Sequence, residues 1–214
     1  MLFFKKNRIR VPDYLEERIY EILTDDGTFI LEGFFDEVQE MLSGLGLERA
    51  DAPPNRDHFI NHFIGTLLWL IKYRTLSTAK NSPRKLAHLD LRFDIETPKA
   101  VDKLFEHFDR DTIKESYDTM DTECKKAFTG ELQKDKRPRF LISPIWAANL
   151  DPNPLQIAAR IFVNSIDHKI FDRLQDTGND SRFENMVEER FVEFSQPAAD
   201  SCKDIHFVWM LNRH

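Results

Sequence analysis

The chain contains 214 residues, of which 41% are hydrophobic, and this length and composition fit one globular domain and exclude a largely disordered protein. The net charge of −7 disfavours broad nucleic-acid binding, although a local basic patch is compatible with it. With only two cysteines, Cys124 and Cys202, a disulfide framework is excluded, and a reducing compartment is the simpler expectation.

The sequence predicts neither a membrane span nor a secretion signal. The densest apolar run, residues 59–71, is shorter than the about 20 residues that cross a bilayer, and it includes polar side chains. The first ten residues place their charges after a short apolar run, which is not the order of a signal peptide. We therefore expect a soluble, cytoplasmic protein.

The N-terminal region of the chain predicts helices. Apolar side chains recur at helical spacing over residues 15–23, 30–45 and, most densely, 59–71. The last of these helices also carries a mixed stripe that includes His62 and Lys72, so we expect it to be central and packed on two sides. The polar residues 77–85 then predict a linker, which is the best candidate boundary between two regions of the chain.

Residues 86–96 carry the clearest pattern in the sequence. Apolar and polar side chains alternate, with Ala87, Leu89, Leu91, Phe93 and Ile95 on one side and His88, Asp90, Arg92, Asp94 and Glu96 on the other. A period of two predicts a half-buried strand, because a helix would place Leu91 and Ile95 on a different face from Leu89 and Phe93.

The remainder of the chain predicts further helices and two further strands. Thr97-Pro98 has the residue types of a helix start, and helical spacing covers residues 97–108, 112–128, 154–174 and 181–194. Residues 139–143 are a short apolar run, and residues 205–211 have the continuous apolar, β-branched and aromatic content of a buried strand.

These elements predict an α+β fold that is predominantly helical. A helical N-terminal region would join a small sheet of three or four strands, near residues 86–96, 139–143 and 205–211, packed by amphipathic helices. We expect one domain over residues 1–214. The alternative is a division into a helical region over residues 1–80 and a mixed α/β region over residues 81–214.

The charged face of the 86–96 strand offers one candidate site. Asp94 and Glu96 would lie about 7 Å apart on this face, and paired carboxylates can hold a hard divalent cation. With Asp90 or Asp172 completing the ligands and His88 as acid or base, Mg²⁺ or Mn²⁺ held there would support phosphodiester hydrolysis. The simpler explanation is a solvated face on which the one arginine pairs with neighbouring carboxylates.

The string FDIET, residues 93–97, resembles the first motif of the DEDD family of 3′–5′ exonucleases and polymerase proofreading domains. That resemblance implies metal-binding roles for Asp94 and Glu96, and it makes Asp172, in the string HKIFD, a loose candidate for the aspartate of the second motif. The resemblance is confined to these short strings. Thr97-Pro98 predicts a helix where the family continues into a hairpin, and no last aspartate preceded by tyrosine or histidine follows. We therefore do not assign the chain to that family.

Two histidines offer a second candidate site. His58 and His62 are four residues apart on a predicted helix, a spacing that can bind one metal ion together with a partner such as His88 or His107. No glutamate follows His58, so the zinc-protease motif is absent. Interfacial histidines hydrogen-bonded to the backbone or to Asn61 are the simpler explanation.

The missing catalytic motifs favour a binding protein. The sequence contains no glycine-rich phosphate loop, nucleophile elbow or Cys–His metal signature. We therefore expect a non-enzymatic subunit, adaptor or regulator of a larger intracellular complex, without a cofactor, that binds a protein partner or further copies of itself. Exposed aromatic anchors beside basic side chains would make the contact. The residues expected to do so are Phe3, Phe4, Lys5, Lys6, Arg8, Arg10 and Trp146.

Overall fold

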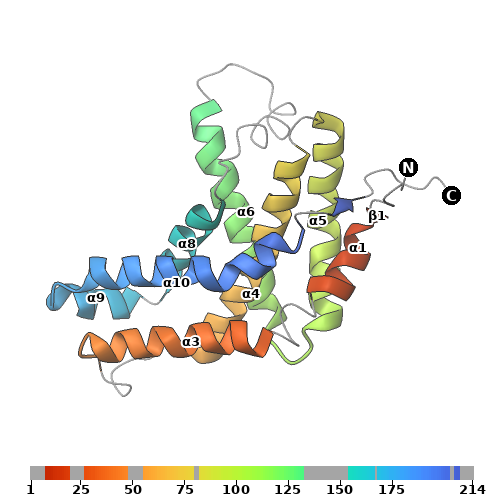
Figure 1. Cartoon of the computed structure of the whole chain (residues 1–214). Helices are drawn as coiled ribbons and strands as arrows, with labels where there is room; N and C mark the ends of the chain where they lie inside the picture. The colour runs from red at the N-terminus through yellow and green to blue at the C-terminus, as the bar shows by residue number, and fades with distance from the viewer. Residues whose placement is uncertain are drawn as a thin grey trace, which may run out of the picture.

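The computed structural model describes residues 8–19, 27–47, 55–79, 82–132, 154–166, 168–202 and 205–207. In chain order the elements are β1 (Arg8–Ile9), α1 (Val11–Tyr14), the π-helical turn η1 (Leu15–Ile19), α3 (Gly27–Gly44), α4 (Arg56–Thr78), α5 (Pro83–Leu104), α6 (Arg110–Leu132), α8 (Pro154–Asn164), α9 (His168–Asp176), α10 (Asp180–Asp200) and β2 (His206–Phe207). Helices α4, α5 and α6 stand side by side, and α3, α9 and α10 extend from them as a lateral arm (Figure 1).

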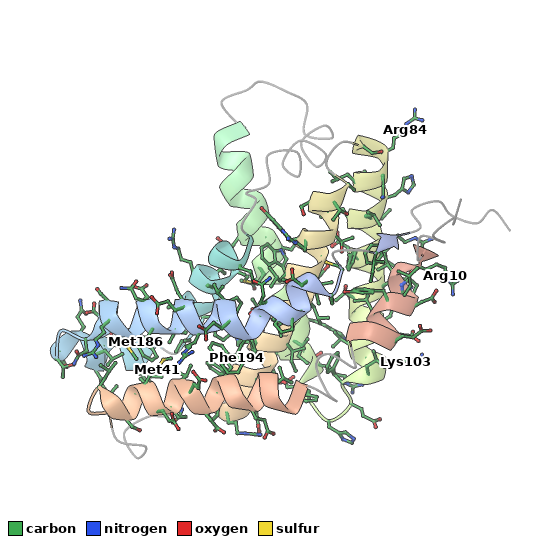
Figure 2. The ribbon with its side chains drawn as sticks, in the orientation of Figure 1. Arg10, Met41, Arg84, Lys103, Met186 and Phe194 are labelled. Atoms are coloured by element: carbon green, nitrogen blue, oxygen red, sulfur yellow. The ribbon has the colours of Figure 1, made fainter. Side chains whose placement is uncertain are left out.

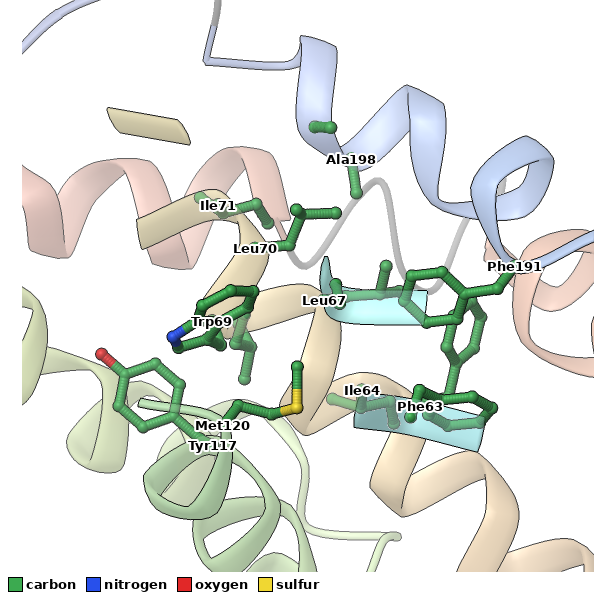
Figure 3. Close-up of a cluster of buried hydrophobic side chains, with 14 of the residues drawn as sticks. Phe63, Ile64, Leu67, Trp69, Leu70, Ile71, Tyr117, Met120, Phe191 and Ala198 are labelled. Atoms are coloured by element: carbon green, nitrogen blue, oxygen red, sulfur yellow. The ribbon is translucent and has the colours of Figure 1, made fainter. Parts of the chain in front are cut away.

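Helix α4 is the centre of the molecule because its sequence is apolar around most of its circumference. It begins at Asn55, whose Oδ1 accepts hydrogen bonds from the backbone N–H groups of Asp57 (3.1 Å) and His58 (3.4 Å). It then packs against α3, α5, α6, α8 and α10. Figure 3 shows Trp69 facing α6, and Leu67 facing Phe191 of α10.

A glycine allows α4 and α6 to approach closely. A Cβ atom on Gly65 would lie 2.5 Å from the carbonyl oxygen of Ile113 and 2.6 Å from the Cβ of Ser116. The Ser116 hydroxyl donates a hydrogen bond of 2.9 Å to the backbone oxygen of His62 on the facing helix. The backbones of α4 and α6 are therefore in contact at this point, where any larger side chain would separate them.

Six phenylalanines attach the lateral arm to the central helices. Phe34 of α3 is the hub, with its ring centroid 4.7 Å from that of Phe63, 5.3 Å from Phe59 and 5.7 Å from Phe162. It also contacts Phe191 and Phe194 of α10. Packed aromatic rings bury large areas of apolar surface, and this cluster holds six of the 18 phenylalanines of the chain.

The prediction of a strand over residues 86–96 is wrong, because these residues lie inside α5. The buried side chains of α5 follow helical spacing: Leu86, Leu89, Asp90, Phe93, Thr97, Ala100 and Val101. The apparent alternation arises from two exceptions to the usual distribution of polarity. Asp90 is charged but buried, and Leu91 and Ile95 are apolar but exposed.

The sequence predicted that a helix begins at Pro98. In the structure Pro98 lies within α5. A proline inside a helix removes one backbone hydrogen bond and costs about 3 kcal/mol. Here α5 packs against α1, η1, α4 and α6, and burial of its apolar face offsets that cost. The helix ends where the backbone of Phe105 leaves helical geometry.

The predicted sheet, and with it the α+β fold class, is also wrong, and the fold is predominantly helical. Within the described ranges the strand pairing consists of β1 and β2, which are parallel and match Arg8 with His206 and Ile9 with Phe207. The predicted strand at 139–143 and residues 208–211 lie outside the described part of the chain. The single helix predicted over 154–174 is divided into α8 and α9.

Candidate functional site: the Lys72 ion cluster and the groove between α3 and α10

Lys72 of α4 is buried, with only 1% of its side chain exposed. Its Nζ lies 2.9 Å from Asp90 Oδ1, 2.5 Å from Asp94 Oδ1 and 2.8 Å from Asp121 Oδ1. Asp90 and Asp94 lie one turn apart on α5, and Asp121 lies on α6. One ammonium group, with as many N–H donors as it has carboxylate partners, therefore joins three helices.

The charges around Lys72 fix its protonation state. Burial by itself lowers the pKa of Lys72, but the carboxylates of Asp90, Asp121 and Asp94 raise it more, so the pKa lies well above the usual lysine value. Burial also raises the pKa of Tyr117, whose ring centroid is 5.7 Å from Lys72 Nζ. At neutral pH Lys72 is therefore an ammonium and Tyr117 a neutral phenol. An ammonium has no lone pair, so Lys72 is neither a nucleophile nor a general base.

The cluster of carboxylates has the spacing of a cation site, but Lys72 already fills it. One oxygen from each of Asp90, Asp94 and Asp121 lies within 4.8 Å of the others. The Lys72 ammonium occupies the position between them. We therefore assign the cluster a structural role, which is to hold α5 and α6 against α4. Asp94, with 40% of its side chain exposed, is the member that reaches the surface.

Glu96 does not join this cluster. Residues two apart on a helix point in nearly opposite directions, so Glu96 lies on a different side of α5 from Asp94. There its carboxylate pairs with Arg92 at 3.2 Å and with Lys99 at 3.3 Å.

The other predicted catalytic and metal residues are also dispersed. Asp172 lies on α9, at the opposite end of the molecule from α5 (Figure 1). His88 lies on the exposed side of α5. The structure thus brings Asp90 and Asp94 together but gives Asp94, Glu96 and Asp172 no common centre, so the hydrolase alternative gains no support from their placement.

The predicted histidine pair is in contact. The rings of His58 and His62 lie 4.4 Å apart, edge to face, and His62 lines a pocket of about 310 Å³ at the α4–α6–α8 junction. Burial, and to a lesser extent His58, lower the pKa of His62, while Glu115 opposes them. Among the described residues, the aspartate cluster is the one group of three or more His, Cys, Asp or Glu side chains that a single ion could reach. Within that part of the chain the two histidines therefore have no third ligand.

Most of the predicted interaction residues lie outside the ranges that the structure describes. Phe3, Phe4, Lys5, Lys6 and Trp146 fall outside the described ranges, and their role stays a prediction. Arg8 belongs to β1, and Arg10 is exposed and pairs with Asp13 at 2.7 Å.

A groove that the sequence did not predict lies between α3 and α10, with a volume of about 740 Å³. Arg190 of α10 lies 3.0 Å from Glu37 of α3, and one turn earlier on α3 a Cβ atom added to Gly33 would lie 3.3 Å from Phe194 Cε1. Since each step forward on one helix matches a step back on the other, the two helices are antiparallel. Each of them is an ordinary amphipathic helix, and the groove exists only where they pair.

The groove has an apolar floor and a charged rim. Met41 of α3, Leu45 directly after the end of α3 and Met186 of α10 line the floor and are partly exposed, and Figure 2 shows the two methionines between α3 and α10. Acidic side chains outnumber basic ones on the rim, which is formed by Glu37, Glu40, Arg182, Glu189, Arg190 and Glu193. Both methionines lie on the apolar stripes of their helices, and for that reason the sequence predicts core positions for them.

Comparison with known proteins identifies no relative, since no family model, no curated protein and no solved structure matches the chain. Within the described residues, no helix combines the length and apolar character that a membrane span requires.

Proposed function

We propose that this chain is a non-enzymatic protein-interaction subunit whose α3/α10 groove binds a short, basic, amphipathic helix of a partner protein. The observation that carries the proposal is the combination of a partly exposed floor, formed by Met41, Leu45 and Met186, with a predominantly acidic rim. The Lys72 cluster does not compete as a functional centre, because its lysine is charged and its carboxylates are already engaged.

The floor supports helix binding through its shape and its chemistry. Methionine side chains are flexible and polarisable, so they adapt to different apolar partners. The residues of α10 that line the groove extend from Arg182 to Glu193, which corresponds to about 16 Å along the helix axis. A partner helix of about three turns, with apolar side chains at i, i+4 and i+7, would cover this length.

The rim supports a basic partner. Glu37 and Glu193 both pair with Arg190, at 3.0 and 2.5 Å. Glu40 and Glu189 are exposed on the same rim. Lysine or arginine side chains flanking the apolar residues of a partner helix would complement them, and such complementarity governs mainly the association rate and the choice of partner.

We place this interaction in the cytoplasm, within a larger complex. The chain has only two cysteines, too few for a disulfide framework, which supports a reducing compartment. Burial raises the pKa of Cys202 to about 11, so the thiol is protonated and unreactive at neutral pH.

A synthetic peptide tests the groove directly. The probe is a fluorescein-labelled helical peptide of about 12 residues, with leucines at i, i+4 and i+7 and lysines beside them. We expect anisotropy titration to show binding that weakens about tenfold or more in Met186→Glu and in the double variant Glu40→Lys/Glu189→Lys. Glu106→Lys, an exposed substitution in the turn after α5, is the matched control and should leave binding unchanged.

A second peptide with the same leucines and with glutamates in place of the lysines tests the rim. It should bind the wild-type chain more weakly than the basic peptide and bind the Glu40→Lys/Glu189→Lys variant more tightly. If both peptides bind wild type equally, or if Met186→Glu binds like wild type while its circular dichroism shows a folded chain, the groove is not the docking site.

A further inference from the structure

The outward face of α5 carries two exposed apolar side chains, one turn apart. Leu91 is 56% exposed and Ile95 is 40% exposed, and they are the large apolar side chains left exposed among the described residues. Ala87 extends the same strip by one turn and is also exposed. Single exposed apolar residues are ordinary, but adjacent ones on a single helix face form a continuous surface.

Opposite charges lie at the two ends of this strip. Arg84 lies two turns before Leu91, and it projects outward from the start of α5 (Figure 2). Asp102 lies two turns after Ile95 on the same face, and its carboxylate also accepts a hydrogen bond of 2.5 Å from Lys114 of α6. Residue 93 is midway between Arg84 and Asp102, and it is also midway between Leu91 and Ile95.

We propose that this face of α5 is a self-association surface, and that it pairs antiparallel with α5 of a second copy of this chain. A twofold axis near residue 93 would place Leu91 and Ile95 of both copies together at the centre. The same axis would bring each Arg84 to the Asp102 of the other copy. A face that is apolar at its midpoint and oppositely charged at its ends is complementary to its own antiparallel copy, which favours a second copy over an unrelated partner.

The size of the surface sets the strength of the contact. From Arg84 to Asp102 the helix is about 27 Å long, and at a width of about 10 Å it covers roughly 270 Å². A stable complex buries about 800 Å² on each partner. The dimer is therefore weak and reversible and depends on protein concentration. It uses a different face from the α3/α10 groove and goes beyond the function proposed there.

Sedimentation velocity on the full chain, from low micromolar to several hundred micromolar, tests the dimer. We expect the dimer fraction of wild type to rise with concentration, and Leu91→Asp to weaken association about tenfold or more. Arg173→Glu, a charge reversal on α9, is the control and should leave association unchanged. A folded Leu91→Asp variant that dimerises like wild type, or a wild-type chain that stays monomeric at the highest concentration, overturns the proposal.

Mixing two charge variants tests the antiparallel arrangement. Arg84→Glu alone would place glutamate against Asp102, and Asp102→Arg alone would place arginine against Arg84, so each variant should be monomeric. An equimolar mixture should form heterodimers, because both end contacts then join opposite charges. A mixture that stays monomeric overturns the pairing of Arg84 with Asp102. Peptide binding by the groove is measured on the same variants and should persist, which separates failure of the dimer from failure of the groove.

Discussion

Lys72 and Asp90 form an ion pair of 2.9 Å between side chains that are almost completely removed from solvent. Such a pair adds little stability by itself, because desolvating two charges offsets most of their attraction. Its importance emerges when one partner is removed. In this molecule the loss of Lys72 would leave three carboxylates facing each other with no cation between them.

Lys72→Met should therefore be strongly destabilising. We expect it to lower the free energy of unfolding by about 3–5 kcal/mol, measured by urea denaturation followed by circular dichroism. The control is Lys103→Met, which removes an exposed pair with Glu16 at 2.5 Å and should cost about 1 kcal/mol or less. Equal effects of the two substitutions would show that the cluster is not the connection between α4, α5 and α6 that we describe.

Gly65→Ala tests the close approach of α4 and α6. The added methyl group would lie 2.5 Å from the Ile113 carbonyl oxygen, so the two helices must separate, at a cost of about 1–3 kcal/mol. Gly44→Ala is the matched control, because no atom lies within 4 Å of its added Cβ. Thermal denaturation should show a lower melting temperature for Gly65→Ala only. A melting temperature equal to that of wild type would contradict the close packing.

His62 should make the stability of the chain depend on pH on the acid side. Burial and His58 lower its pKa, so below the usual histidine value of about 6.5 the unfolded chain binds a proton that the folded chain resists. Its contribution to stability is thus present above that value and decreases as the pH falls below it.

The measurement is the urea midpoint at a pH of about 7.5 and of about 5.5. His62→Gln should show a smaller decrease in midpoint between these two conditions than wild type does. His107→Gln, an exposed histidine in the turn after α5, should retain the wild-type decrease. If His62→Gln retains it too, another group is responsible for the acid sensitivity.

Where apolar side chains coincide with buried positions, helices can be predicted from the sequence. The dense apolar run at residues 59–71 predicted the buried helix α4, and stripes over residues 30–45 and 112–128 correspond to α3 and α6. Helices α3 and α6 each have an apolar stripe that is buried, so periodicity identifies them, whereas α4 is apolar on most sides and is identified by the density of its apolar run. Their boundaries differ by a few residues, since capping groups such as Asn55 act locally.

Helix α5 could not be predicted in this way, because one charged residue, Asp90, is buried and two large apolar residues, Leu91 and Ile95, are exposed. Asp90 is buried only because Lys72 of another helix pairs with it, and no local pattern reveals that partner. Leu91 and Ile95 are exposed, so an apolar residue at these positions does not mark the core. Together the three residues turned a helical period into an alternating one.

The candidate site was predicted only incompletely, and for the wrong geometric reason. Asp90 and Asp94 do lie together, but as residues one helical turn apart and not as neighbours on a strand face. The same change of geometry moves Glu96 away from them. The α3/α10 groove depends on how Met41 and Met186 are positioned across two distant segments, and this information is not local to either segment.

The pairing of Arg8 with His206 has a consequence for synthesis of the chain. The ring of Phe207 packs edge to face on Tyr14 at 5.0 Å, so α1 receives this covering only from a segment that leaves the ribosome almost two hundred residues later. Closing so long a loop is entropically costly and slow compared with local helix formation. During translation α1 can therefore pack against α5 well before Phe207 exists, but the side of Tyr14 that contacts Phe207 stays accessible until β2 has been synthesised.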